Sequence, residues 1–392
     1  MEFRQLRADD FDERVALSTF AFQFELSAEE VEDRRNNFRP QDGWGIFDEN
    51  GHMLSGLFLL PFETWIQGRS YKMGGLAGVA TWPETRRHGY VSRLLEHSLQ
   101  TMRDNGQTIS MLHPFSFPFY RKYGWEMTCE RKQYTIHTAQ LPPRIDTPGQ
   151  VVRMFKPDVE LLHPLYSAFA SQYSGTLIRD AEWWERRVLN KKGVIAVYYN
   201  EDEEAQGYVF YRVADRKLTI HELVSTNEMS RKALWTYIGN HDSMIDQLTI
   251  TVAVDDPLPL LIPDPRIKQE ITPYFMSRIV DAEAFVRQYP FAEAETEEEV
   301  NLSLTDQHAD WNNGNYRLKI AKEGTARLER LPGEESAPGG IACDVQALTA
   351  MLAGDRRPSL LQETGCISGD SKSIAILDRR IPRRTTHLMD FF

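Results

Sequence analysis

Cysteine is scarce in this chain of 392 residues. The three cysteines, Cys129, Cys343 and Cys366, lie far apart and show none of the spacings that bind metal ions or support disulfide exchange. Sparse cysteines of this kind are typical of proteins from a reducing compartment. The sequence therefore predicts a cytoplasmic protein without a bound metal ion.

Long apolar segments are also missing. No run approaches the roughly 20 apolar residues that cross a bilayer, and residues 1–7 lack the apolar core of a signal peptide. Positive charge is in deficit, because 45 lysines and arginines stand against 57 aspartates and glutamates, which gives a formal net charge of −12. This balance argues against binding to nucleic acid or to an anionic membrane, and it is compatible with a cationic substrate. We expect neither a membrane nor a nucleic-acid partner.

The most informative stretch spans residues 78–91. It begins with small and β-branched residues that favour a strand, turns at Pro83, and places Arg86, Arg87 and Gly89 directly before apolar residues at helical spacing. The first amides of a helix have no intrahelical partner and lie at the positive end of its dipole, so they bind phosphate well. Glycine allows close approach of the backbone, and arginine pairs with phosphate. The pattern predicts an anion site, although an ordinary basic surface loop would share part of it.

Two later segments support this interpretation. Residues 108–112 are typical of another strand, and residues 117–126 contain the run Phe-Pro-Phe-Tyr and then Gly-Trp. Together with the basic loop they resemble the acetyl-CoA-binding half of the GNAT acetyltransferases, whose signature is Gln/Arg-x-x-Gly-x-Gly/Ala followed one strand later by a Phe-Tyr-x-x-x-Gly-Phe-like segment. Val91 departs from the last position of the signature. The resemblance implies that acetyl-CoA is the co-substrate, that its pyrophosphate is held by Arg86, Arg87 and Gly89, and that the cofactor-binding residues are Val79, Ala80, Thr81, Arg86, Arg87, His88, Gly89 and Tyr90.

The chain is longer than one hydrophobic core usually organises. Prolines and a glycine in residues 141–149 mark a boundary. The order of helices and strands then recurs, but residues 225–231, the counterpart of the basic loop, lack a glycine and contain Glu228. We therefore predict an α/β (α+β) fold with a catalytic GNAT unit at residues 1–141, a second GNAT-like unit without a cofactor site at residues 150–274, and an α+β unit at residues 275–392.

The third unit resembles a sterol-carrier-protein-like domain. The order of the three units and the terminal phenylalanine resemble the Eis family of bacterial N-acetyltransferases over the whole chain. Members acetylate primary amines, in some cases aminoglycosides or lysine side chains, and assemble as hexamers. The resemblance implies a homohexamer that transfers acetyl to the amine of a small molecule or a lysine. It also assigns Tyr120 as the catalytic tyrosine and places the terminal carboxylate of Phe392 in the active site.

The proton chemistry leaves the base open. Tyr120 suits the role of proton donor to the leaving thiolate, because its reference pKa of ~10 is only ~1.5 units above that of a thiol. A terminal carboxylate with a pKa of ~3.5 would take a proton from an ammonium group near ~9 at a cost of roughly 7.5 kcal/mol, which burial would reduce. The carboxylate of Phe392 is therefore either a buried base or an anchor for the ammonium group, and Asp390 and His113 are alternative bases.

We expect the acceptor pocket to include Phe20, Phe22, Phe24, His113, Asp390 and Phe391. Relatives that take aminoglycosides carry acids at the places that correspond to Phe22 and Phe391, so a smaller or more apolar amine is expected. Two other functions are open. One is a non-catalytic scaffold that senses acetyl-CoA or binds an apolar ligand, which a large apolar cavity in the third unit would favour. The other is transfer of acyl chains longer than acetyl.

Overall fold

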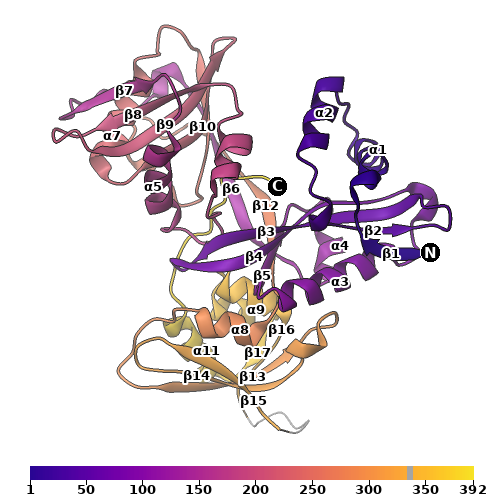
Figure 1. Ribbon diagram of the computed structural model, residues 1–392. Coiled ribbons are helices and arrows are strands. Elements are labelled where there is room, and N and C mark those ends of the chain that lie inside the picture. Colours follow the sequence, from indigo (N-terminus) through magenta and orange to yellow (C-terminus); the bar gives the residue numbers. More distant parts are fainter. Residues whose placement is uncertain (333–338) are drawn as a thin grey trace.

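The computed structural model describes residues 1–332 and 339–392. Its N-terminal unit lies at the right of Figure 1, the second unit lies at the upper left, and the third unit lies below both. The C-terminus returns to the middle of the molecule, beside the strands of the first unit. The last residues of the chain therefore lie between the first two units, and Leu388 and Phe392 also belong to the apolar core of the third unit.

The helices and strands follow one another as two similar sets and then a third, different set. The first set comprises β1 (Glu2–Gln5), α1 (Phe11–Phe22), α2 (Ala28–Asn36), β2 (Gly43–Phe47), β3 (Met53–Ile66), β4 (Arg69–Thr81), α3 (Tyr90–Asp104), β5 (Ile109–Leu112), α4 (Phe117–Lys122) and β6 (Glu126–His137). The second comprises β7 (Gln150–Met154), α5 (Val159–Ala170), α6 (Ala181–Trp183), β8 (Val194–Tyr199), β9 (Ala205–Ala214), β10 (Lys217–Ser225), α7 (Glu228–Gly239), β11 (Gln247–Val252) and β12 (Lys268–Ile279). The third comprises α8 (Ala282–Gln288), β13 (Glu298–Thr305), β14 (Gly314–Ile320), β15 (Ala326–Arg330), β16 (Ile341–Asp344), α9 (Val345–Leu352), α10 (Pro358–Glu363), β17 (Ser368–Gly369) and α11 (Ser371–Arg380).

The first two sets form one continuous sheet by exchanging their last strands. The order is β1-β2-β3-β4-β5-β12-β6-β11-β10-β9-β8-β7. Strand β12 of the second set pairs antiparallel with β5, and β6 of the first set pairs antiparallel with β11. Each half is completed by a strand from the other. Without its neighbour, each half would therefore lose one strand and expose an unpaired sheet edge.

Strand β12 crosses the expected start of the third unit at residue 275. Residues 275–279 are buried in the central sheet and pair with β5 and β6. A short apolar run of this kind suits a strand in either unit, so the sequence alone does not show to which sheet it belongs. The third unit begins structurally with α8, directly after this strand.

The two faces of β4 carry different neighbours. A Cβ atom at Gly74 would lie 2.2 Å from the sulfur of Met102 in α3. A Cβ atom at Gly75 would instead meet the rings of Phe62 and Phe392. Successive residues of a strand point to opposite faces, so α3 and the C-terminal phenylalanine lie on opposite faces of β4. Helix α3 and the chain terminus therefore approach this strand from different sides.

The third unit has its own five-stranded sheet, in the order β15-β14-β13-β16-β17, and its helix α9 contacts β6 and β12 of the central sheet. A shared apolar core joins Tyr71 and Met73 of β4 and Ile109 and Met111 of β5 to this unit. Within residues 1–332 and 339–392, none of the helices combines the length and the apolar character that crossing a membrane requires. The third unit thus stabilises the strands that carry the candidate site.

Candidate active site

Strands β4 and β5 separate in the middle of β4. They pair in parallel only from Met73 to Leu76 on β4, against residues 109–112 of β5. Beyond Leu76, β4 continues to Thr81 without a ladder partner on the β5 side in the part of the chain that the structure describes. The pairing of β4 with β3 is also irregular here, and Gly78 has a φ of 59°. Such a bulge turns the strand away from its neighbour, which opens a fork between β4 and β5.

Arg14 of α1 forms a hydrogen bond with the backbone of the bulge. Its Nη2 donates to the carbonyl oxygen of Gly78 at 2.5 Å. The side chain is buried, and its Nε and Nη1 have no hydrogen-bond partner among the described residues. Burial without a carboxylate partner lowers the pKa of Arg14 to about 10. A buried cation without a counter-ion is unfavourable for folding, so its contact with the bulge is better explained by function than by stability.

Arg14→Met is expected to leave the protein equally stable or more stable, and to lower turnover about tenfold, because the bulge carbonyl loses its donor and small misplacements are costly. The lowered pKa means that the charge costs roughly 3 kcal/mol below pH 10, and that this cost declines as the pH rises from about 10 to the ordinary pKa of arginine. Thermal unfolding at pH 7 and kcat test both parts. Arg14→Lys, which keeps a charge, is the control. A clear loss of stability with normal turnover would show that Arg14 has only a structural role.

The N-terminus of α3 is open. Its N-cap is Gly89, in the left-handed region with a φ of 79°, and no side chain caps the helix. Arg86, Arg87 and Gly89 are exposed, and neither arginine forms an ion pair within the described chain. The ring of His88 stacks on that of Tyr90, with ring centroids 5.7 Å apart, so the loop contacts the first residue of α3. Free helix amides beside two unpaired arginines make a site for an anion.

Tyr120 lies on α4, directly after β5. It is 3% exposed, and its ring packs against Phe119 at 5.2 Å and Trp125 at 6.4 Å. Its hydroxyl has no hydrogen-bond partner among the residues that the structure describes, and burial raises its pKa well above the ordinary value. The same apolar cluster contains Leu76 and Leu112, where the two strands separate. Val79, Tyr90 and Val91 pack against this cluster. Tyr120 is thus a protonated donor beside the fork.

The C-terminal residues reach the same place from the opposite face. The ring of Phe392 lies 4.9 Å from those of Phe62 and Phe275, and the residue is 9% exposed. It also touches Gly75, one residue before the pairing of β4 with β5 ends. Phe391 is half exposed, and its ring lies 5.0 Å from that of His113. The chain therefore ends at the fork.

The two alternative bases differ in environment. Asp390 is buried, and Nε of Arg179 donates to its oxygens at 3.1 and 3.2 Å. The indole N–H of Trp183 donates to it at 2.8 Å. A carboxylate with these partners is a structural anchor rather than a free base. His113 packs on Tyr274 and Phe391, and burial lowers the pKa of its imidazole, so the ring is neutral at pH 7 and able to accept a proton.

The aromatic residues of the N-terminal segment have different positions from those at the chain terminus. Phe20 is 55% exposed, and its ring lies 5.0 Å from that of Trp82, at the end of β4. Phe22 is also exposed. Phe24 faces the guanidinium group of Arg34 at 5.0 Å. Among the ring contacts of the described residues, Phe20 is thus the one of the three that lies next to the end of β4.

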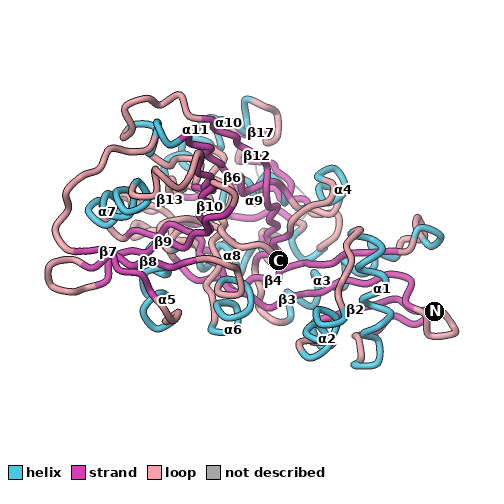
Figure 2. The backbone as a smooth tube through the Cα atoms, turned by 90° about the horizontal axis from the view of Figure 1, so that it is seen from above, coloured by secondary structure: helices cyan, strands magenta, loops and turns pink. Residues whose placement is uncertain are grey.

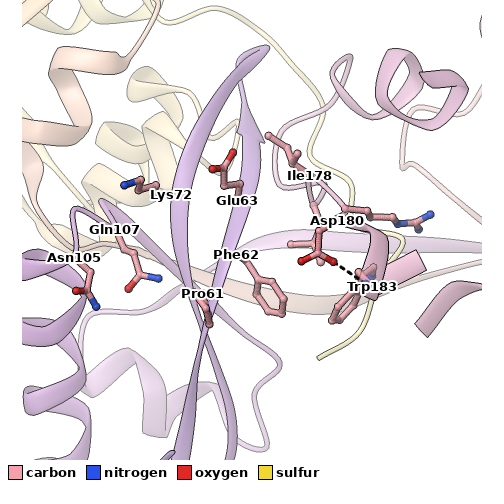
Figure 3. Close-up of a pocket in the computed structure, with 11 residues that line it drawn as sticks. Pro61, Phe62, Glu63, Lys72, Asn105, Gln107, Ile178, Asp180 and Trp183 are labelled. Carbon is pink, nitrogen blue, oxygen red and sulfur yellow. Dashed lines mark hydrogen bonds between the residues drawn. The ribbon is translucent and has the colours of Figure 1, made fainter. Parts of the chain in front are cut away.

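A cavity of about 480 Å³ lies beside the terminus, and sequence reasoning did not place it (Figure 3). Phe62 and Trp183 lie side by side in it, with ring centroids 5.2 Å apart. Asp180, which accepts from the backbone N–H of Trp183, and Glu63 supply negative charge. In the sequence, residues 180–184 mainly indicate a helix start with core tryptophans. A local pattern does not show that β3 of the first unit forms the other wall of the cavity. The lining residues are Pro61, Phe62, Glu63, Lys72, Asn105, Gln107, Leu177, Ile178, Arg179, Asp180 and Trp183.

Comparison with protein families agrees with this arrangement. Residues 2–128 and residues 175–279 each match an acetyltransferase (GNAT) domain, and residues 282–389 match a sterol carrier protein domain. An uncharacterized N-acetyltransferase of Streptomyces avermitilis is 26% identical over 94% of this chain and 95% of its own length. These matches confirm the predicted order of two GNAT units and a sterol-carrier-like unit.

Solved structures show the same fold over the entire chain. A probable N-acyltransferase from Enterococcus faecalis has a TM-score of 0.91 and 29% identity, and the match covers 100% of this chain and 99% of that one. Eis1 from Mycobacterium abscessus has a TM-score of 0.83 and 19% identity, with 100% of both chains covered. The chain therefore belongs to the GNAT N-acetyltransferases, with the two GNAT domains and the sterol carrier protein domain in the arrangement that Eis1 also has.

Proposed function

We propose that this enzyme transfers the acetyl group of acetyl-CoA directly to a primary amine of a small molecule or a lysine side chain. The observation that carries the proposal is the fork between β4 and β5, which has the open helix end and its arginines at one side and Tyr120 and Phe392 near its base. A thioester in the fork would have free β4 backbone groups to polarise its carbonyl. Tyr120 would protonate the departing thiolate.

The proposed acceptor is a small amine with an apolar or aromatic body. The terminus, His113 and the neighbouring cavity present aromatic rings, among them Phe62, Trp183 and Phe391. Glu63 and Asp180 supply negative charge that favours an ammonium group, and Lys72 supplies one positive charge among the lining residues. Rings also attract cations through their faces. A screen of amines from polyamines and aminoglycosides to arylalkylamines and lysine peptides, read by liberated thiol, tests this acceptor class. A preference for aminoglycosides would contradict it.

The binding scaffold is less well supported. The cavity of the third unit, next to Tyr316 and Ile341, measures about 250 Å³ in the described part of the chain. Ligand pockets usually range from roughly 300 to 1,000 Å³. Apolar side chains fill the core of this unit, with Tyr316 and Ile320 fully buried. These dimensions favour a structural role for the third unit. The homohexamer also stays a prediction, which light scattering of the purified protein tests.

Arg86→Ala combined with Arg87→Ala is expected to weaken acetyl-CoA binding about 30-fold, because each exposed arginine contributes about 1 kcal/mol to holding the pyrophosphate. Isothermal titration calorimetry measures the change. The matched control removes two other exposed arginines, Arg216 and Arg266, which pair with Asp246 and Asp264. It alters the net charge equally and should leave the Kd within about twofold. No heat of binding to the unmodified protein at millimolar acetyl-CoA would contradict the proposed function.

A further inference from the structure

A fully buried ion cluster joins the second GNAT unit to the end of the chain. Arg179 donates from Nη2 and Nη1 to the carboxylate of Glu222 on β10, at 2.6 and 3.1 Å. Its Nε donates to Asp390, two residues before the terminus, at 3.1 and 3.2 Å. The three side chains are at most 3% exposed. One cation thus balances two carboxylates from distant parts of the sequence.

Side chains of the second unit also hydrogen-bond to the two carboxylates. The hydroxyl group of Tyr208 donates to Glu222 at 2.8 Å, and the indole of Trp183 donates to Asp390 at 2.8 Å. The guanidinium group of Arg179 lies 3.8 Å from the ring centroid of Tyr166, whose hydroxyl donates to the carbonyl oxygen of Leu177 at 2.8 Å and lies 3.4 Å from Asp390. A buried charge needs such a complete shell of partners, so the cluster specifies one position for Asp390.

The backbone of the terminal segment is held by the same unit. The N–H of His387 donates to the carbonyl oxygen of Ser174 at 2.9 Å, and the N–H of Ser174 donates to the carbonyl oxygen of Thr385 at 3.0 Å. Arg187 donates to the carbonyl oxygen of Phe391 at 2.7 Å. The hydroxyl of Tyr274 donates to the carbonyl of Asp390 at 2.8 Å. Three of these four contacts come from residues 174–187.

We propose that Arg179 is a positioning residue, and that the second GNAT unit serves to hold the C-terminus of the chain at the fork of the first. The inference rests on the proposed function in one respect, because it gives the carboxylate of Phe392 a role in turnover. Two residues beyond a fixed Asp390 reach at most about 7 Å, so the anchor confines the terminal carboxylate to the base of the fork.

Loss of the arginine should release the tail. Without Arg179, Glu222 and Asp390 would remain as two buried carboxylates with no cation between them. Glu222 lies within strand β10 and is not free to leave. Asp390 lies near a chain end, and its withdrawal into water relieves the repulsion at the cost of the contacts of the last three residues only. The tail is thus the element that moves.

The first test reads the position of the tail without reference to activity. A carboxypeptidase that prefers aromatic terminal residues is added to the full-length protein, and release of Phe392 is followed by mass spectrometry. Arg179→Met should speed the release at least about tenfold. Asp390→Asn leaves Arg179 and Glu222 as a balanced pair, so it keeps the fold and should also speed the release. Unchanged rates in both variants would overturn the proposal.

The matched control is Arg278→Met. Arg278 is buried, and its Nη2 pairs with Asp306 at 2.6 Å, but within residues 1–332 and 339–392 no hydrogen bond or ion pair joins this pair to the terminal residues. Loss of this buried ion pair in Arg278→Met should change the melting temperature. The rate at which Phe392 is released should stay within about twofold of that of the unmodified protein. Equal acceleration in Arg278→Met would show that any loss of stability frees the tail, which would overturn the specific role of Arg179.

The second test asks whether the anchor acts through Phe392. Arg179→Met and Asp390→Asn should each lower kcat at least about tenfold and leave the Kd for acetyl-CoA within about twofold. In a protein that already lacks Phe392, the same substitutions should have no further effect on residual turnover. Independent, multiplying effects would overturn the positioning role. If the unmodified protein transfers no acetyl group, the proposed function fails, and the release of Phe392 still decides whether Arg179 holds the tail.

Discussion

Deletion of Phe392 is expected to lower kcat by about 100-fold to 1,000-fold and to leave the Kd for acetyl-CoA within about twofold, because a positioned proton acceptor contributes this much to a transfer reaction. The deletion moves the terminal carboxylate back by one residue, about 3.8 Å. It also removes the ring that lies against Phe62 and Phe275. Steady-state kinetics by thiol release, together with calorimetry, measure the two quantities separately.

The loss of the ring must be separated from the displacement of the carboxylate. Phe392→Leu keeps a terminal carboxylate at the same chain position and fills much of the same space, so its kcat should stay within about tenfold of normal. Addition of a single glycine after Phe392 keeps the ring and displaces the carboxylate, and it should resemble the deletion. Full turnover in the extended protein would contradict a role for the terminal carboxylate.

His113 offers the other route for the proton. Its ring lies against that of Phe391, and burial lowers its pKa below the ordinary 6.5, so the imidazole is neutral and able to accept a proton above that value. If His113 were the base, its replacement by glutamine would lower kcat as strongly as the deletion of Phe392, and the acidic limb of the pH profile would disappear. A small effect of His113→Gln, with the acidic limb retained, would leave the carboxylate as the base.

The strand, basic loop and helix of residues 78–104 could be predicted from the sequence because their signals are local. A strand, a basic loop with Gly89 and an amphipathic helix follow one another within residues 78–104, and the physical reasons for each lie within that stretch. The same holds for α2, whose capping Ser27 and Glu30 mark its start at Ala28. The comparisons confirmed the order of the domains for a related reason, since each domain is a contiguous piece of chain.

The contacts that position the terminus could not be predicted in this way. Helix α6 and the strands β8 and β9 lie between Arg179 and Glu222. The rest of the second unit and nearly all of the third lie between Glu222 and Asp390, and no local pattern links the three. The exchange of β6 and β12 has the same origin, because a buried apolar strand carries no mark of its neighbours. Asp390 is a candidate base in the sequence and an anchored partner of Arg179 in the structure, since only the fold supplies the arginine.

Tyr120→Phe is expected to lower kcat by about 100-fold to 1,000-fold, because the thiolate would lose its proton donor. The ring contacts with Phe119 and Trp125 remain in this variant. The hydroxyl has no partner among the described residues, so its removal leaves no buried group unpaired and should alter the free energy of unfolding by less than about 1 kcal/mol. Activity and stability should therefore separate in this variant.

Burial affects both partners of the proton transfer in the same direction. It raises the pKa of Tyr120, and in this protein it also raises the pKa of the buried thiol of Cys129 to about 12. A thiolate that forms in the apolar fork is subject to the same effect, so the difference between donor and acceptor stays small. Because the tyrosine stays protonated as the pH rises through its ordinary value of ~10, its ionisation should not cause an alkaline fall in kcat.

Tyr123→Phe is the matched control for Tyr120→Phe. Tyr123 follows α4 by one residue, is 5% exposed, and packs against Phe119 at 5.2 Å and His308 at 4.7 Å. Its substitution removes the same hydroxyl group from the same apolar cluster, one turn of the chain away, and turnover should be normal. If Tyr120→Phe retained full turnover, the thiolate would take its proton from water, and the closeness of Tyr120 to the fork would reflect packing alone. Equal losses in both variants would indicate that the cluster, rather than one hydroxyl, supports the reaction.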